Sequence, residues 1–310
     1  MGAEADHRER ALPLIAGDGV QILRVEEPRQ SEPSTLSRSE LWATLYLLGI
    51  GNALAAVIFP AIQSEVNLSI VTVAATVVGI HLLRQSPDAA VRRGDWIMAA
   101  VVAFLVLIPH RAASWVAVTG VALYSMGRDR RSTSDVAAAS VFIAIAASSF
   151  WVVVLVQMLS SSLLAWDAAL AAGLLEVVGH GSVERIGNVI VTGDETTLVV
   201  MVWCSSLQNV LYGFLCWTAI ARAIRPEWQL ADLLALLAVG GLVLTANTLR
   251  LALLGLSANT YEWVHGPVGS TVFNLGLLLL IAAIALHSTG PATSSLGHLR
   301  SAARGSEPHW

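Results

Sequence analysis

The stretch that decides the fold is LADLLALLAVGGLVLTANTLRLALLGL, residues 230–256. It is longer than the roughly 20 apolar residues that a helix needs to cross the hydrocarbon core of a bilayer. Its charged side chains are Asp232, near the start, and Arg250, near the end. The stretch therefore predicts a membrane-spanning helix with a cation close to one membrane face.

The composition of the whole chain agrees with a membrane protein. Of its 310 residues, 55% are hydrophobic and 13% are charged, and the mean hydropathy is +0.67. These values are far more apolar than those of an ordinary soluble domain. We therefore expect an all-α polytopic membrane protein with the lipid bilayer as its surroundings. The net charge of −4 hides an uneven distribution and says nothing about nucleic acid. No basic patch laced with aromatic residues suggests such binding, so no nucleic-acid partner is expected.

About eight transmembrane helices are expected. Apolar stretches of spanning length, or close to it, occupy residues 41–60, 66–84, 96–110, 112–127, 135–159, 204–224, 230–256 and 268–287. The third and fourth are short, and the turn Pro109-His110-Arg111 between them is tight. Reading this pair as one broken helix is an alternative that would change the parity of the count.

The distribution of arginine orients these spans, because loops rich in Lys and Arg stay in the cytoplasm. All 18 cationic side chains are arginine, and fifteen of them lie in the two tails and in the loops 84–95, 128–134 and 222–229. The remaining three are Arg111, Arg185 and Arg250. Eight spans with both termini cytoplasmic fit this alternation best.

The chain divides into three segments. Residues 1–40 are polar and rich in Arg, Glu, Pro and Ser, without an apolar core of signal-peptide type, so we expect a disordered cytoplasmic tail. Residues 41–287 form the transmembrane domain, and residues 288–310 form a second cytoplasmic tail.

Residues 160–203 are the one substantial loop expected on the outer face. Within it, 163–178 is apolar but is interrupted by Asp167 and Glu176, which predicts an interfacial helix. A ninth span at this position is the alternative, and it would move the arginines of 222–229 to the outer side, against the rule.

The end of this loop predicts a short β-hairpin. Two runs rich in β-branched residues, Val189–Thr192 and Thr196–Val202, flank Gly193-Asp194-Glu195. The second run leads directly to Cys204. The other cysteine, Cys216, falls in the same predicted helix, twelve residues or about 18 Å further on, so both are expected to be free thiols.

Three polar residues converge on the outer membrane face in this topology: Cys204, Arg250 and His265. A thiol, a permanent cation and an imidazole at one depth are the parts of a cysteine acyl-transfer site. No cofactor and no metal are expected.

Arg250 is the strongest of the three signals. A guanidinium within an apolar stretch costs at least ~2.5 kcal/mol and cannot lose its charge. It either snorkels to the interface or pairs with a carboxylate such as Glu262, or it stabilises a thiolate and the oxyanion of a tetrahedral intermediate. Asn247 lies on the same helix face and is positioned to orient it.

Cys204 is either a plain buried thiol or a nucleophile at a helix start. Gln208 lies one turn below it. Ser205 and Ser206 rank second as nucleophiles, because a hydroxyl needs a stronger base than a thiol does.

His265 is the preferred general acid and base, since the turn Gly266-Pro267 would hold its imidazole at the mouth of the last span. His180 is the next candidate for that role, and His110 also lies on the outer side.

Four stretches in this order resemble the exosortase/archaeosortase family of membrane transpeptidases. They are Glu184-Arg185-Ile186-Gly187-Asn188-Val189-Ile190, Cys204-Ser205-Ser206-Leu207, Ala246-Asn247-Thr248-Leu249-Arg250-Leu251, and His265 with Gly269. The resemblance covers about residues 180–270. Two residues depart from the family pattern: Ser206 replaces the usual Gly, and Trp203 replaces a small residue.

The resemblance implies a cysteine protease or transpeptidase in the bacterial cytoplasmic (inner) membrane, with its active site facing the non-cytoplasmic side. Cys204 would be the nucleophile, and Arg250 and His265 would complete the site. The substrates would be exported, membrane-anchored proteins with a carboxyl-terminal motif such as Pro-Glu-Pro, a transmembrane helix and a basic tail. Such enzymes often occur in cells that make extracellular polysaccharide.

Two readings without catalysis compete with this one. In a transporter or passive scaffold, Arg250 would bind an anion and Cys204 would be inert, but transporter sites tend toward the bilayer midplane, with broken helices and repeats. An assembly factor for polysaccharide export is the other reading. The sequence leaves open the recognition motif, the acceptor (water or an amine) and the oligomeric state.

Overall fold

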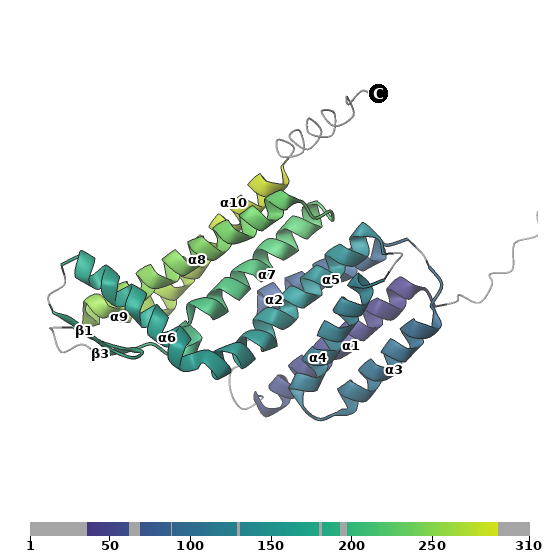
Figure 1. Ribbon diagram of the computed structural model, residues 1–310, viewed down its shortest axis with the longest axis horizontal. Coiled ribbons are helices and arrows are strands. Elements are labelled where there is room, and N and C mark those ends of the chain that lie inside the picture. Colours follow the sequence, from purple (N-terminus) through teal and green to yellow (C-terminus); the bar gives the residue numbers. More distant parts are fainter. Residues whose placement is uncertain are drawn as a thin grey trace, which may run out of the picture. The chain divides into compact units, whose positions relative to one another are not determined.

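The computed structural model describes residues 36–61, 69–87, 89–128, 131–179, 182–192 and 197–290, and from Ser37 onward these belong to one compact unit. The tails predicted at 1–40 and 288–310 lie almost entirely outside the described residues. The helices are α1 (Arg38–Ala61), α2 (Ile70–Arg84), α3 (Arg93–Leu107), α4 (Arg111–Met126), α5 (Thr133–Ala146), α6 (Val152–Val177), α7 (Ser206–Ile224), α8 (Leu230–Leu256), α9 (Ala258–His265) and α10 (Pro267–Thr289) (Figure 1).

The described part of the chain is mainly helical, and each of the eight predicted spans coincides with a helix. Within the described residues, three helices are long and apolar enough to cross a membrane: Thr133–Val177, Leu230–Leu256 and Pro267–Thr289. The count of eight spans is not confirmed. The short helices α3 and α4 are separate and pack against each other as a pair.

The predicted separation between the span at 135–159 and an interfacial helix at 163–178 is wrong. Helix α5 continues through a π-helical turn at Ala147–Trp151 into α6, giving a 45-residue helix from Thr133 to Val177. The expected interfacial helix at 163–178 is therefore the end of this long helix and not a separate element. No proline interrupts the run. The residues around Asp167 are mainly alanine and leucine, which favour the helix, so this single aspartate does not end it. The chain changes direction between α5 and α6 (Figure 1), as π-helical turns often allow.

The predicted β-hairpin is confirmed and is part of a small sheet. Strand β2 (Val189–Thr192) pairs antiparallel with β3 (Thr197–Val199), in the register Ile190 opposite Leu198. A third strand, β1 (Val183–Ile186), precedes them and gives the order β1-β2-β3. Gly187, with a φ of 61°, allows the tight turn between β1 and β2.

Buried aspartates hold the arginine-rich segments at helix starts. Asp95, Asp135 and Asp232 each lie in the first turn of a helix (α3, α5 and α8) and each accepts from a backbone N–H there. Their ion-pair partners are Arg128 for Asp95, Arg38 at 3.4 Å for Asp135, and Arg222 and Arg225 at 2.6 and 2.7 Å for Asp232. These carboxylates are favourable near the positive end of a helix dipole.

Three of the arginine-rich segments meet at one end of the helices. A β-bridge pairs Ser37 with Ala90, and the Ser86 hydroxyl lies 2.9 Å from that of Ser132. The positive-inside pattern requires such a gathering on one face.

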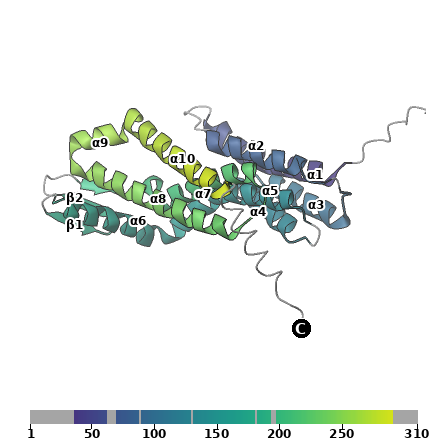
Figure 2. The ribbon, with the colours of Figure 1, turned by 90° about the horizontal axis from the view of Figure 1, so that it is seen from above.

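The opposite end holds the sheet and the short helix α9, which are at the same end of the molecule in both views (Figures 1 and 2). Ile190 and Leu198 of the sheet pack in one hydrophobic cluster with Leu175 of α6, Leu251 of α8 and Val264 of α9. We call this the sheet-end cluster. The candidate site lies next to this cluster, because Cys204 packs against it.

Candidate functional site

Cys204 lies in a 3₁₀ turn, Val202–Cys204, that joins the sheet to α7. Helix α7 begins at Ser206, with Ser205 as its N-cap, so the prediction that Cys204 starts this helix is wrong by two residues. Cys204 is half-buried and packs against the sheet-end cluster. Both Cys204 and Cys216 are free thiols, as predicted.

Asn247 of α8 fastens this turn. Its side-chain nitrogen donates to the carbonyl oxygen of Cys204 and to the hydroxyl of Ser206, both at 2.9 Å. Its side-chain oxygen accepts from the amide of Asn209 at 2.9 Å. The residue is only 2% exposed, so these bonds form in a setting where an unpaired polar group is expensive. The sequence analysis pointed to Asn247 as a residue that orients Arg250. In the structure, its hydrogen bonds go to the cysteine turn.

Asp167 of α6 is a second anchor, which the sequence analysis missed. Its Oδ2 accepts a hydrogen bond of 3.0 Å from the backbone N–H of Ser206, the first residue of α7. The carboxylate is buried, and it satisfies one of the free N–H groups at a helix start. A carboxylate in an apolar helix was the available signal, but the sequence could not show which helix start it would cap.

Arg250 lies three residues after Asn247 on α8 and is half-buried. Its guanidinium carbon is 5.4 Å from the centre of the Phe273 ring of α10, a cation–π contact. Its Nε is buried and has no hydrogen-bond partner among the described residues. Throughout the described ranges, no carboxylate forms an ion pair with Arg250, including Glu262. The guanidinium therefore packs against Phe273, and no acidic side chain among the described residues pairs with its charge.

His265 ends α9 and is exposed, and its ring stacks on that of Tyr261 with 5.2 Å between centroids. The preceding residue, Val264, is buried in the sheet-end cluster. Close packing at Gly269 fixes the turn into α10, since a Cβ there would lie 2.1 Å from the carbonyl oxygen of Trp263. This contact gives a physical reason for the glycine.

The three predicted site residues thus come from segments that meet at the sheet-end cluster. Cys204 is joined through Asn247 to the helix that carries Arg250. In the part of the chain that the structure describes, no hydrogen bond or ring contact joins His265 to either of them.

The alternative histidines have other positions. His110 caps α4, its Nδ1 accepting from the backbone of Ala112 at 3.2 Å. His180 lies outside the described residues.

The competing nucleophiles are both buried. The Ser206 hydroxyl accepts from Asn247, whereas the buried Ser205 hydroxyl has no hydrogen-bond partner in the described part of the chain. At the positions that depart from the family pattern, Ser206 supplies this acceptor and Trp203 is 74% exposed. Among the described residues, no group of three or more His, Cys, Asp or Glu side chains is placed to hold a metal ion.

These features define a helical membrane protein with a free cysteine whose turn is hydrogen-bonded to the helix that carries Arg250. The chain belongs to the transmembrane exosortase family: the family model described as transmembrane exosortase (Exosortase_EpsH) matches residues 29–282. Neither the curated proteins nor the solved structures include a match to this chain.

Proposed function

We propose that this protein is a membrane-embedded cysteine protease or transpeptidase. It cleaves the carboxyl-terminal sorting signals of exported proteins at the outer membrane–water interface, through an acyl-enzyme on Cys204. The observation that carries the proposal is the bond from Asn247 to Cys204, which ties a free thiol to the helix that bears Arg250.

The residues supply the parts of an acyl transfer. His265 takes the proton of the Cys204 thiol, the sulfur attacks the scissile carbonyl carbon, and the carbonyl oxygen takes up the negative charge. Arg250, whose charge no described carboxylate neutralises, stabilises that oxyanion. The carbon–nitrogen bond then breaks, and the departing amine takes a proton from His265. Water or an acceptor amine then gives a proton to His265, attacks the resulting thioester and forms the new carbon–oxygen or carbon–nitrogen bond. The carbon–sulfur bond breaks, and the Cys204 sulfur takes the proton back from His265.

His265 has to approach the sulfur for this role. Its imidazole is exposed and stacked on Tyr261, so it can rotate when a substrate arrives. Catalytic hydrogen bonds in enzymes without substrate are often long and shorten in the complex.

The proposed orientation places Cys204 on the non-cytoplasmic side of the bacterial inner membrane. It is supported by the arginine-rich helix ends, which gather away from the sheet and are expected to face the cytoplasm.

Processing of a co-expressed reporter tests the proposal. The reporter ends in the segment of an exported protein from the same cells that combines a short motif, an apolar span and a basic tail. Cys204→Ala and Cys204→Ser are expected to abolish cleavage, and Arg250→Ala and His265→Ala to reduce it strongly. Thr245→Ala is the control, because the hydroxyl of this exposed residue donates within its own helix, away from both the turn and the cavity. Full cleavage by both Cys204 variants would reject the thiol mechanism and favour a scaffold or transporter.

A further inference from the structure

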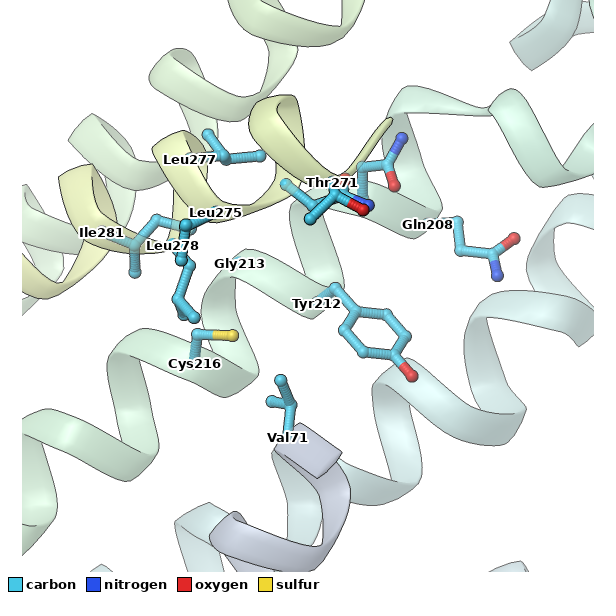
Figure 3. A pocket seen from close by; sticks show the side chains of 12 residues that line it. Val71, Gln208, Tyr212, Gly213, Cys216, Thr271, Leu275, Leu277, Leu278 and Ile281 are labelled. Atoms are coloured by element: carbon cyan, nitrogen blue, oxygen red, sulfur yellow. The ribbon is translucent and has the colours of Figure 1, made fainter. Parts of the chain in front are cut away.

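A cavity of about 530 Å³ lies between α7 and α10, with Val71 of α2 at its edge (Figure 3). Its volume falls within the range of ligand-binding sites in proteins. Both bordering helices start at the end of the molecule that holds Cys204. The cavity therefore extends from that end toward the middle of the helices.

The lining changes in character along the cavity. Near the helix starts it presents amide and hydroxyl groups, from Gln208, Asn209, Thr271 and Asn274. Eight residues further along α7, or about 12 Å, the lining consists of Cys216 together with leucine and isoleucine side chains of α10 (Figure 3).

The polar end of the cavity is connected to the cysteine turn. Asn209, which lines the cavity, donates to Asn247, and Asn247 donates to the carbonyl of Cys204. An occupant that contacts Asn209 is thus connected to the backbone of Cys204 through two hydrogen bonds, from Asn209 to Asn247 and from Asn247 to Cys204.

The described lining contains no charged side chain. A phosphate headgroup would enter such a cavity without a counter-charge, which is strongly unfavourable. Peptide groups need only hydrogen-bond partners, and amide and hydroxyl side chains supply both donors and acceptors. The chemistry of the lining favours a polypeptide segment over an anionic lipid.

We propose that this cavity holds the part of the substrate that enters the bilayer directly after the scissile bond. Peptide groups that are not yet helical pair with the polar end, and one face of the following apolar helix packs near Cys216. The inference rests on the proposed function for the identity of the occupant. It assigns recognition of this substrate segment to the cavity surface formed by α7 and α10.

Cysteine cross-linking tests this placement without requiring catalysis. In the Cys204→Ala variant, Cys216 is the one remaining thiol of the chain, which has two cysteines. The probe is the same reporter with a single cysteine moved through the first three turns of its apolar span. Mixed disulfides are scored after mild oxidation in membranes.

Leu279 provides the control, because it is exposed on α10 and does not line the cavity. The control variant carries Cys204→Ala, Cys216→Ala and Leu279→Cys. The expected result is that Cys216 forms mixed disulfides at reporter positions on one helical face, in about tenfold higher yield than the control, the ratio produced by ~1.4 kcal/mol of preferential docking.

Equal yields from Cys216 and the control, or no disulfide at any position, would overturn the placement. Cleavage of the unmodified reporter by the wild-type protein is measured in parallel. Cys204-dependent cleavage without a cross-link to Cys216 refutes the cavity and leaves the proposed function standing. A face-specific cross-link without Cys204-dependent cleavage refutes the mechanism and leaves the binding site standing.

Discussion

Asn247 donates a hydrogen bond of 2.9 Å to the backbone carbonyl oxygen of Cys204, although the two residues are 43 positions apart. Since Arg250 follows Asn247 by three residues on the same helix, it projects from the same face about 4.5 Å further along the axis. The geometry of one rigid helix therefore sets the distance between the thiol turn and the cation.

Replacing Asn247 is expected to displace the thiol turn. Asn247→Ala leaves the Cys204 carbonyl, the Ser206 hydroxyl and the Asn209 amide without their partner, which costs about 1–3 kcal/mol for a buried group. We expect slower reporter cleavage and a lower melting temperature in detergent. Thr245→Ala is the control, because the exposed Thr245 bonds only to its own helix. Unchanged cleavage by Asn247→Ala would remove this residue from the site.

Removing the cap at Asp167 is expected to loosen the start of α7. Asp167→Ala deletes the acceptor of the Ser206 N–H, and the loss of an N-cap acceptor typically destabilises a protein by about 1 kcal/mol. Asp167→Asn keeps an oxygen acceptor and should retain most of the cleavage. Glu176→Ala, an exposed acidic position on the same helix, should have no effect. Thermal unfolding and cleavage rates check the series, and equal behaviour of the Ala and Asn variants would contradict the capping role.

Arg250→Ala is expected to separate activity from stability. Without the guanidinium, the transition-state charge loses a partner, and loss of one such group typically lowers rates by about 10²–10³-fold. Membrane insertion should improve, because an arginine within a span is unfavourable by at least ~2.5 kcal/mol. Cleavage rates and the yield of folded protein in membranes check both effects. A variant that is poorly folded and poorly active would indicate a structural arginine.

Gly269→Ala is expected to disrupt the turn before α10. The added Cβ would lie 2.1 Å from the Trp263 carbonyl oxygen, so α9 and α10 would have to separate next to His265. At Gly276, on the same helix, a Cβ meets nothing within 4 Å, and Gly276→Ala is the matched control. Cleavage should fall for the first variant alone. Equal activity of the two would show that this contact does not hold the histidine segment.

Thiol labelling in intact cells is expected to distinguish the two cysteines. Cys204 is half-buried at the sheet end, whereas Cys216 is 8% exposed within α7. A membrane-impermeant maleimide applied from outside should label wild-type protein and Cys216→Ala, but not Cys204→Ala. Labelling of Cys204 only after the cytoplasmic face is opened would reverse the proposed orientation.

Local patterns predicted much of this molecule. The apolar runs predicted the positions of helices, and the two β-branched runs on either side of residue 194 predicted the hairpin. Both signals depend only on residues that are close in sequence. The continuity of α5 and α6 was missed, since polar residues in an apolar helix suggest an interface unless their partners are known. The link from Asp167 to Ser206 joins residues 39 positions apart, and no periodicity encodes such a pair.

The 45-residue helix carries both Asp135, bound to Arg38 at the arginine-rich end, and Asp167, which caps α7 beside Cys204. These carboxylates are 32 positions apart, or about 48 Å along the helix, with the π-helical turn between them. One continuous run of helix thus connects the arginine-rich end with the start of α7. A change in the angle between its two halves would either bend the helix further at Ala147–Trp151 or displace Asp167, and with it the start of α7 next to Cys204.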